Sequence, residues 1–384
     1  MLLLMLCRLP LTAQMQRYSL DFSLSQKDFA DTIGIDFERQ QVIVPVSIGD
    51  KTLHFLLDTG ASQATVYDDV ELADAKRLGF IESHDAVAAS SVVPIVQLPP
   101  LTIGRTTFTG MQAIVQHRVV KRRDIDGIVG FDLVCKGLNM KIDVRRRQLI
   151  LSDRYDCFDL EGGMQLKYTM NYHVPYIEVS PFEGYRERVL FDTGSRNLYA
   201  MNRQSFSKGE AKTKGACLSQ VEGRSMGRHA IGHGGAEQRS ETLFLALQRL
   251  QLATFVFSDV HTLTTQGGSH LGAALLDYGT VAFNPRRKRM LFVPYDQATE
   301  AVVANKQLEK AIVPIDGKPV VGLVWERGDA YRAGLREGDV ITGVDGRAIG
   351  SMGDYLRLGP SAGHEHSIAV TDSLGVSKLL KIRW

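Results

Sequence analysis

The sequence lacks the features that mark several large classes of protein. Its net charge is only +2, which favours neither a nucleic-acid binder nor a strongly acidic partner. Beyond the N-terminus, no stretch reaches the roughly 18 apolar residues needed to cross a bilayer. The chain has four cysteines at wide, irregular spacing, which indicates neither a disulfide framework nor a zinc pattern. We therefore expect a globular chain with no nucleic-acid partner and no integral membrane segment.

The first 14 residues, MLLLMLCRLPLTAQ, differ from the rest of the chain. They begin with an apolar run, and Ala13 could precede a cleavage site, which is typical of the end of a secretory signal peptide. Arg8 interrupts the run, and no basic start precedes it. We interpret residues 1–14 as a signal peptide remnant and expect an exported protein.

The chain contains a long internal repeat. The first copy reads QVIVPVSIGDKTLHFLLDTGAS, and the second reads NYHVPYIEVSPFEGYRERVLFDTGSR. Each predicts a half-buried strand, a polar turn and an apolar strand that ends in Asp-Thr-Gly. Downstream, each copy continues with an apolar-apolar-Gly tripeptide, a short helical stretch and two strands around a basic turn. Because the copies are too long for solenoid units, we expect two homologous lobes.

Two Asp-Thr-Gly sequences in aligned repeats predict a pair of carboxylates. Glycine lets the chain turn tightly after the strand, and the threonine hydroxyl can hydrogen-bond within the loop or across to its twin. If the lobes pack about a pseudo-twofold axis, Asp58 and Asp192 meet. Two close carboxylates cannot easily both ionise, so they share a proton. Such a pair can activate a water as a base and protonate a peptide carbonyl as an acid.

These loops resemble the active-site loops of pepsin-like and retroviral aspartic proteases. The resemblance covers roughly residues 38–295 and rests on both Asp-Thr-Gly loops and on the tripeptides Ile128-Val129-Gly130 and His270-Leu271-Gly272. It implies an aspartic endopeptidase with two β-rich lobes around a central cleft and Asp58 and Asp192 as the catalytic pair. It also implies a grip between Thr59 and Thr193 and a hydrogen bond from Ser195 to Asp192. The supporting loop residues are Thr59, Gly60, Ala61, Thr193, Gly194 and Ser195.

Two alternatives stay open from the sequence. A degenerate protease could keep the fold as a peptide-binding scaffold, because fold does not fix function. A homodimer in which each half pairs with another chain is disfavoured, because one chain supplies both aspartates.

His270 stands where the family resemblance implies an aliphatic residue, at the start of the second apolar-apolar-Gly tripeptide. The segment Ser83–Leu98 is the candidate for a flap over the cleft, or for an ordinary surface loop.

Histidines and basic runs elsewhere indicate no cofactor and no metal. His229 and His233 are four residues apart, but the surrounding glycines argue against a helix, and no third ligand is evident. The basic runs at Lys121–Arg123 and Arg286–Arg289 are best explained as solvated turns.

The composition changes after residue 296. Gln297–Lys310 predicts a helical linker, and AGLREGDVI followed by VDG predicts a short helix, a strand and a hairpin turn. This phrase resembles a bacterial PDZ domain over roughly Lys310 to Trp384. PDZ domains bind extended peptides or C-termini by strand addition, although the carboxylate-binding loop has no clear counterpart here. The combination resembles aspartyl proteases with PDZ tails from Gram-negative bacteria, which implies a periplasmic or envelope location.

The predicted fold is mostly β, with two retropepsin-like lobes and a C-terminal PDZ-like α+β domain. The expected boundaries are 15–155 for the first lobe, 156–296 for the second, 297–309 for the linker and 310–384 for the PDZ-like domain. The segment Ser19–Phe29 alternates enough to add a strand to the first lobe. The expected partners are a peptide or protein substrate and a possible peptide ligand of the PDZ-like domain.

Overall fold

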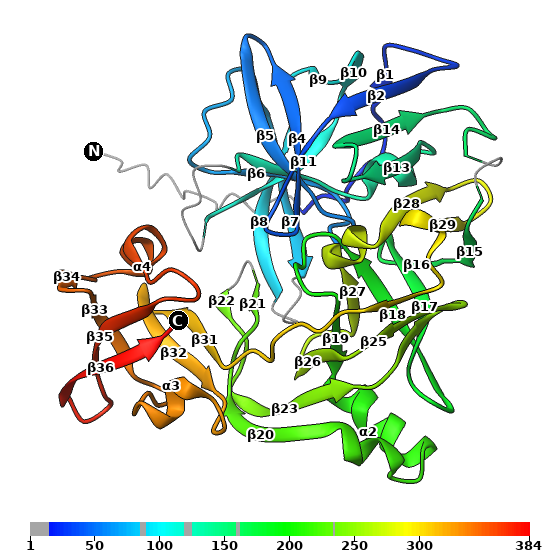
Figure 1. The fold of residues 1–384 in the computed structure, drawn as a ribbon. Coiled ribbons are helices and arrows are strands. Elements are labelled where there is room, and N and C mark those ends of the chain that lie inside the picture. The colour runs from blue at the N-terminus through cyan, green and yellow to red at the C-terminus, as the bar shows by residue number, and fades with distance from the viewer. Residues whose placement is uncertain (1–14, 85–89, 119–124, 159–161, 233–234) are drawn as a thin grey trace, which may run out of the picture.

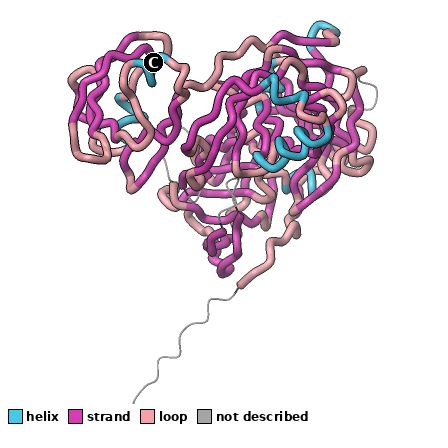
Figure 2. The backbone as a smooth tube through the Cα atoms, turned by 90° about the horizontal axis from the view of Figure 1, so that it is seen from below, coloured by secondary structure: helices cyan, strands magenta, loops and turns pink. Residues whose placement is uncertain are grey.

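The computed structural model describes residues 15–84, 90–118, 125–158, 162–232 and 235–384. The predicted signal peptide, the basic run at 121–123, His233 and residues 85–89 of the flap candidate lie outside the described residues. The chain is mostly strand, as predicted, and forms two lobes with a third, smaller body beside them (Figures 1 and 2). None of the helices in the described ranges is long and apolar enough to span a membrane.

An 11-stranded sheet builds the N-terminal lobe in the order β1-β10-β9-β4-β5-β12-β6-β11-β8-β7, with β3 paired to β4. A single turn of helix, α1 (Asp132–Cys135), follows β12. The strands are β1 (Ser23–Leu24), β3 (Asp36–Glu38), β4 (Gln41–Ile48), β5 (Lys51–Leu57), β6 (Ala64–Tyr67), β7 (Lys76–His84), β8 (Ser90–Gln97), β9 (Leu101–Ile103), β10 (Thr106–Thr109), β11 (Gln112–Gln116) and β12 (Gly127–Val129). The strand predicted within Ser19–Phe29 is β1, which pairs with β10.

A second 11-stranded sheet builds the C-terminal lobe in the order β20-β23-β26-β19-β27-β18-β17-β24-β25-β30, with β16 paired to β17. Its strands are β16 (Thr169–Asn171), β17 (Val174–Phe182), β18 (Tyr185–Asp192), β19 (Tyr199–Asn202), β20 (Val221–Gly227), β23 (Ser240–Leu247), β24 (Leu250–Leu252), β25 (Phe255–Ser258), β26 (Val260–Thr265), β27 (His270–Gly272) and β30 (Glu300–Val302). The lobe also contains α2 (Arg203–Lys212), the 3₁₀ helices η1 (Ala216–Gln220) and η2 (Ala273–Asp277), and the small hairpin of β21 (Ile231–Gly232) and β22 (Gly235–Ala236).

A six-stranded sheet joins the two lobes, in the order β15-β29-β28-β13-β14-β2. The junction is the antiparallel pair β13–β28, with Met140 opposite Phe283 and Ile142 opposite Val281. Both strands are fully buried, so this sheet extends one apolar core through both lobes. Its strands are β2 (Ala30–Gly34), β13 (Asn139–Asp143), β14 (Gln148–Ser152), β15 (Met164–Lys167), β28 (Gly279–Asn284) and β29 (Arg289–Pro294).

The linker contains no α-helix, so the prediction of a helical linker is wrong. After η3 (Tyr295–Gln297), the chain forms β30, which runs parallel to β25 with Phe257 opposite Ala301. Strand pairing with the C-terminal lobe overrides the local helix propensity of Gln297–Lys310, because propensity is a weak prior against tertiary context.

The last body is a small α+β domain with its own apolar core. Its sheet order is β31-β32-β33-β35-β36, with β34 paired to β33. The elements are β31 (Lys310–Ile315), β32 (Lys318–Val324), α3 (Asp329–Arg332), β33 (Val340–Val344), β34 (Arg347–Ala348), α4 (Met352–Leu358), β35 (Glu365–Thr371) and β36 (Ser377–Arg383). The predicted short helix, strand and hairpin turn are α3, β33 and the turn into β34.

Candidate active site

Each Asp-Thr-Gly loop is held by the same strand arrangement. β5 runs into Asp58 and pairs in parallel with β12, with Leu57 opposite Val129. β18 runs into Asp192 and pairs in parallel with β27, with Phe191 opposite Leu271. The predicted apolar-apolar-Gly tripeptides therefore lie directly beside the strands that carry the aspartates, and this confirms the repeat at the level of strand register.

The glycines that end these tripeptides permit a close approach of the chain. A Cβ on Gly130 would lie 2.7 Å from the carbonyl oxygen of Ala61, and a Cβ on Gly272 would lie 2.7 Å from that of Ser195. The next residues make matching hydrogen bonds, Phe131 N–H to Ala61 O at 2.7 Å and Ala273 N–H to Ser195 O at 2.8 Å. Each loop is thus fastened to its own lobe in the same way.

Thr59 and Thr193 lock the two loops together. The Thr59 hydroxyl donates to Phe191 O at 2.7 Å, and the Thr193 hydroxyl donates to Leu57 O at 2.7 Å. Each hydroxyl also accepts the backbone N–H of the other threonine at 3.0 Å. Both residues are fully buried. The four bonds are related by a pseudo-twofold axis and lie within one chain, so a second chain is not needed to bring the loops together.

The two carboxylates meet at this axis. Within each loop, one carboxylate oxygen accepts two backbone N–H groups: Gly60 at 2.8 Å and Ala61 at 3.1 Å for Asp58, and Gly194 at 2.9 Å and Ser195 at 3.3 Å for Asp192. The glycines also face the opposite carboxylate, because a Cβ on Gly60 would lie 2.6 Å from Asp192 Oδ1 and one on Gly194 would lie 2.5 Å from Asp58 Oδ2. Glycine at these positions therefore lets the two acids approach each other.

Burial and proximity favour one shared proton. Burial, the charge of Asp192 and a hydrogen bond with Asp192 raise the pKa of Asp58 well above its ordinary value. Burial also raises the pKa of Asp192, but the hydrogen bond from Asp58 and the N–H groups of its own loop oppose that rise. The two buried acids are therefore best suited to share one proton, with one carboxyl protonated and the other ionised, and such a pair can act as an acid and a base at once.

Two details of the second loop were singled out in the sequence. Ser195 hydrogen-bonds the Asp192 carboxylate, as the family resemblance implied, and does so through its backbone N–H at 3.3 Å. The loop geometry explains this, because the same N–H contact is made by Ala61, which has no hydroxyl. His270 does not disturb the second lobe, since β27 keeps its register and His270 Nδ1 lies 3.1 Å from Gly268 O. Burial lowers the pKa of His270, so the ring is neutral at neutral pH.

The sequence reasoning missed a buried carboxylate behind the first loop. Asp132, on α1, accepts hydrogen bonds from the Tyr18 hydroxyl at 2.7 Å and from Ala64 N–H at 3.0 Å. Burial raises its pKa from 3.8 to about 6. Asp132 thus ties the N-terminal segment to the strand that follows the Asp58 loop. The only sequence signal for this buried acid is its position two residues after Gly130. The second lobe gives no matching signal, because the residue two positions after Gly272 is alanine.

A second buried carboxylate lies in the C-terminal lobe. Glu187, on β18, accepts hydrogen bonds from the Tyr199 hydroxyl and from the Ser269 hydroxyl, the latter at 2.8 Å. These contacts connect β18 to β19 and to the residue before β27. Burial raises the pKa of Glu187. The strand pattern did not predict that Glu187 is buried, because its hydrogen-bond partners lie on other segments of the chain.

The flap candidate is part of a long hairpin. β7 and β8 pair from Lys76–Gln97 at the base to His84–Ser90 near the tip. In Figure 1 the hairpin projects from the N-terminal lobe toward the C-terminal lobe. The candidate Ser83–Leu98 contains β8 and the end of β7, so the first strand of the hairpin was missed. The N-terminal segment contacts the hairpin, where Gln16 N–H donates to Phe80 O at 2.7 Å.

The described residues contain no group of three His, Cys, Asp or Glu side chains that could hold a metal ion. His229 instead lies 3.0 Å from Thr264 O through Nε2, and its backbone N–H donates to the buried Glu237. It therefore packs within the C-terminal lobe.

Two family models match parts of this chain. Residues 44–133 match the family model described as aspartyl protease, and residues 312–370 match the model described as PDZ domain. The chain carries an aspartyl protease domain and a PDZ domain. The aspartyl protease match includes the Asp58 loop and Gly130 but ends before the second lobe. The crystal structure of aspartic proteinase from Irpex lacteus is similar over 72% of this chain and 100% of that chain, with 13% identity and a TM-score of 0.47. A search of curated proteins found no match.

The PDZ domain packs against the C-terminal lobe at a close backbone contact that involves glycines from both. Arg228 N–H donates to Gly322 O at 2.7 Å, and a Cβ on Gly227 would lie 2.5 Å from the same oxygen. Trp325 stacks on Phe244 with ring centroids 5.7 Å apart. β20 and β32 thus lie close enough for backbone contact, and a small apolar cluster seals the interface.

Proposed function

We propose that this protein is an aspartic endopeptidase with Asp58 and Asp192 as its catalytic pair. The observation that carries the proposal is the close approach of these two carboxylates, on loops gripped together by Thr59 and Thr193. In this mechanism the ionised member of the pair takes a proton from a water held between the carboxylates. The protonated member donates its proton to the carbonyl oxygen of the scissile peptide bond as the water attacks. The steps use only groups of this chain, peptide and water.

The test is digestion of a diverse peptide library between about pH 3 and 8, read by mass spectrometry. We expect wild type to cleave and both Asp58→Asn and Asp192→Asn to lose all cleavage, because an amide cannot take part in the proton exchange. Asp50→Asn, in the exposed turn between β4 and β5, is the matched control and keeps full activity. Full activity in either dyad variant would refute the assignment.

The second candidate is a peptide-binding scaffold that uses the protease lobes, the PDZ domain or both. The presence of a PDZ domain favours it, since such domains bind extended peptides. It predicts peptide affinity without turnover, unchanged by Asp58→Asn.

We further propose export to the periplasm or envelope, on the strength of residues 1–14. Fractionation of cells that produce the full chain tests this, and a purely cytoplasmic, unprocessed product would contradict it.

A further inference from the structure

One strand of the C-terminal lobe has an unpaired stretch of edge. β17 pairs with β18 on one side, from Tyr176 opposite Leu190 to Phe182 opposite Tyr185. On its other side, β16 covers only residues 174–176, and β24 pairs only with Ser180. In the part of the chain that the structure describes, residues 177–179 therefore have no strand partner on that side. An uncovered edge presents backbone N–H and C=O groups that can pair with another chain.

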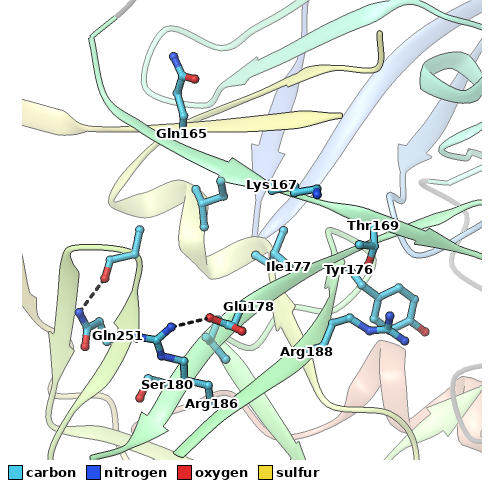
Figure 3. A pocket seen from close by; sticks show the side chains of 13 residues that line it. Gln165, Lys167, Thr169, Tyr176, Ile177, Glu178, Ser180, Arg186, Arg188 and Gln251 are labelled. Carbon is cyan, nitrogen blue, oxygen red and sulfur yellow. Dashed lines mark hydrogen bonds and ion pairs between the residues drawn. The ribbon is translucent and has the colours of Figure 1, made fainter. Parts of the chain in front are cut away.

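A pocket of about 510 Å³ opens along this edge. Its floor is formed by residues 176–180, and β15 forms the facing wall with Gln165 and Lys167 (Figure 3). β15 is itself the outermost strand of the six-stranded sheet, because it pairs only with β29. The volume lies within the roughly 300–1,000 Å³ of ligand pockets. Neither Asp58 nor Asp192 lines it.

The pocket carries an excess of positive charge. Lys167, Arg186 and Arg188 line it, together with a single carboxylate, that of Glu178. Arg186 pairs with Glu178 at 3.2 Å. Arg188 lies over the ring of Tyr176 at 5.1 Å from its centroid. Among the described residues, neither Lys167 nor Arg188 forms an ion pair, so two cations remain for an incoming anion.

We propose that this surface, β17 residues 177–179 with Lys167 and Arg188, binds an extended acidic peptide segment of another protein. The segment adds as a strand to the open edge of β17, and its carboxylates pair with Lys167 and Arg188. Backbone pairing supplies affinity, and the two cations select glutamate or aspartate side chains. The site is separate from the protease dyad and does not depend on catalysis.

The test uses a fluorescein-labelled, end-blocked octapeptide of alternating glutamate and threonine, with fluorescence anisotropy as the readout. A lysine-threonine octapeptide is the charge control. Two further peptides have the parent sequence with methylated backbone nitrogens. One is methylated at every glutamate and the other at every threonine, so each lacks the backbone N–H groups that point to one side of the strand. We expect the parent to bind, the lysine peptide not to bind, and at least one methylated peptide to lose affinity by about tenfold. Hydrogen exchange of residues 177–179 should slow when the parent binds.

Variants locate the site. Lys167→Ala and Arg188→Ala should each weaken binding about two- to fivefold, as expected for exposed ion pairs. The double variant Lys167→Glu/Arg188→Glu should prefer the lysine peptide. Lys212→Ala, an exposed cation on α2, should bind as wild type does. No binding at about 1 mM parent peptide, equal binding of the lysine peptide, or full binding of both methylated peptides would overturn the proposal.

Discussion

Thr59 and Thr193 exchange hydrogen bonds across the lobe interface, each backbone N–H donating to the other hydroxyl at 3.0 Å. Because each hydroxyl also donates to a strand carbonyl of the opposite lobe, the grip positions both aspartates and holds the lobes together.

Removing one hydroxyl of the grip should destabilise the protein. Thr59→Val keeps the shape of the side chain but leaves Phe191 O and Thr193 N–H without partners. Unsatisfied buried groups cost about 1–3 kcal/mol each, so we expect a loss of a few kcal/mol. Urea unfolding measures it. Thr107→Val is the control, because it removes a half-buried hydroxyl that bonds to Thr102 within the β9–β10 hairpin, and it should lose less than about 1 kcal/mol. Equal losses would argue against the grip.

Adding a methyl group between the carboxylates should abolish activity. In Gly60→Ala, the new Cβ would lie 2.6 Å from Asp192 Oδ1, and in Gly194→Ala it would lie 2.5 Å from Asp58 Oδ2. Both distances are below van der Waals contact, so the acids must separate and stop sharing a proton. Library digestion should show at least about a hundredfold loss. Gly34→Ala, with open space at its Cβ, should remain fully active. Wild-type rates in Gly60→Ala would show that the acids need not touch.

Asp132 should make stability depend on pH. Its pKa is about 6 in the folded protein and 3.8 ordinarily, so the folded state binds its proton more tightly. Stability from this group is therefore complete below about pH 4 and is lost as the pH rises to about 6, by about 3 kcal/mol in total. Asp132→Asn should remove this slope from chemical unfolding measured between these pH values. An unchanged slope in the variant would assign it to other groups.

A larger side chain in the contact between β20 and β32 should separate the PDZ domain from the C-terminal lobe. Gly227→Val places a side chain against Gly322 O, whereas Gly268→Val, with nothing within 4 Å of its Cβ, is the control. Trp325 is one of only two tryptophans and stacks on Phe244. In a Trp384→Phe background, its emission should shift to the red in Gly227→Val as the ring becomes exposed to water. The domain keeps its own core, so its folding should persist. Unchanged emission would contradict this view of the interface.

The repeat, the two Asp-Thr-Gly loops and the PDZ-like tail could be predicted from sequence, because each depends on local chemistry. A strand that ends in Asp-Thr-Gly needs only its own period-two pattern and a glycine to be recognised. The strand β30 could not be predicted in the same way. Its pairing partner, β25, lies more than 40 residues earlier, and the local sequence favours helix.

The sequence by itself determined which residues form the candidate site: two aspartates, two threonines and the glycines around them. Only the tertiary structure decided that Ser195 acts through its backbone, that Asp132 and Glu187 are buried acids, and that β17 keeps an open edge beside three cations. These features depend on distance between segments far apart in the chain. Burial and proximity set the pKa of an acid and the partners of a strand, and neither can be read from residue order alone.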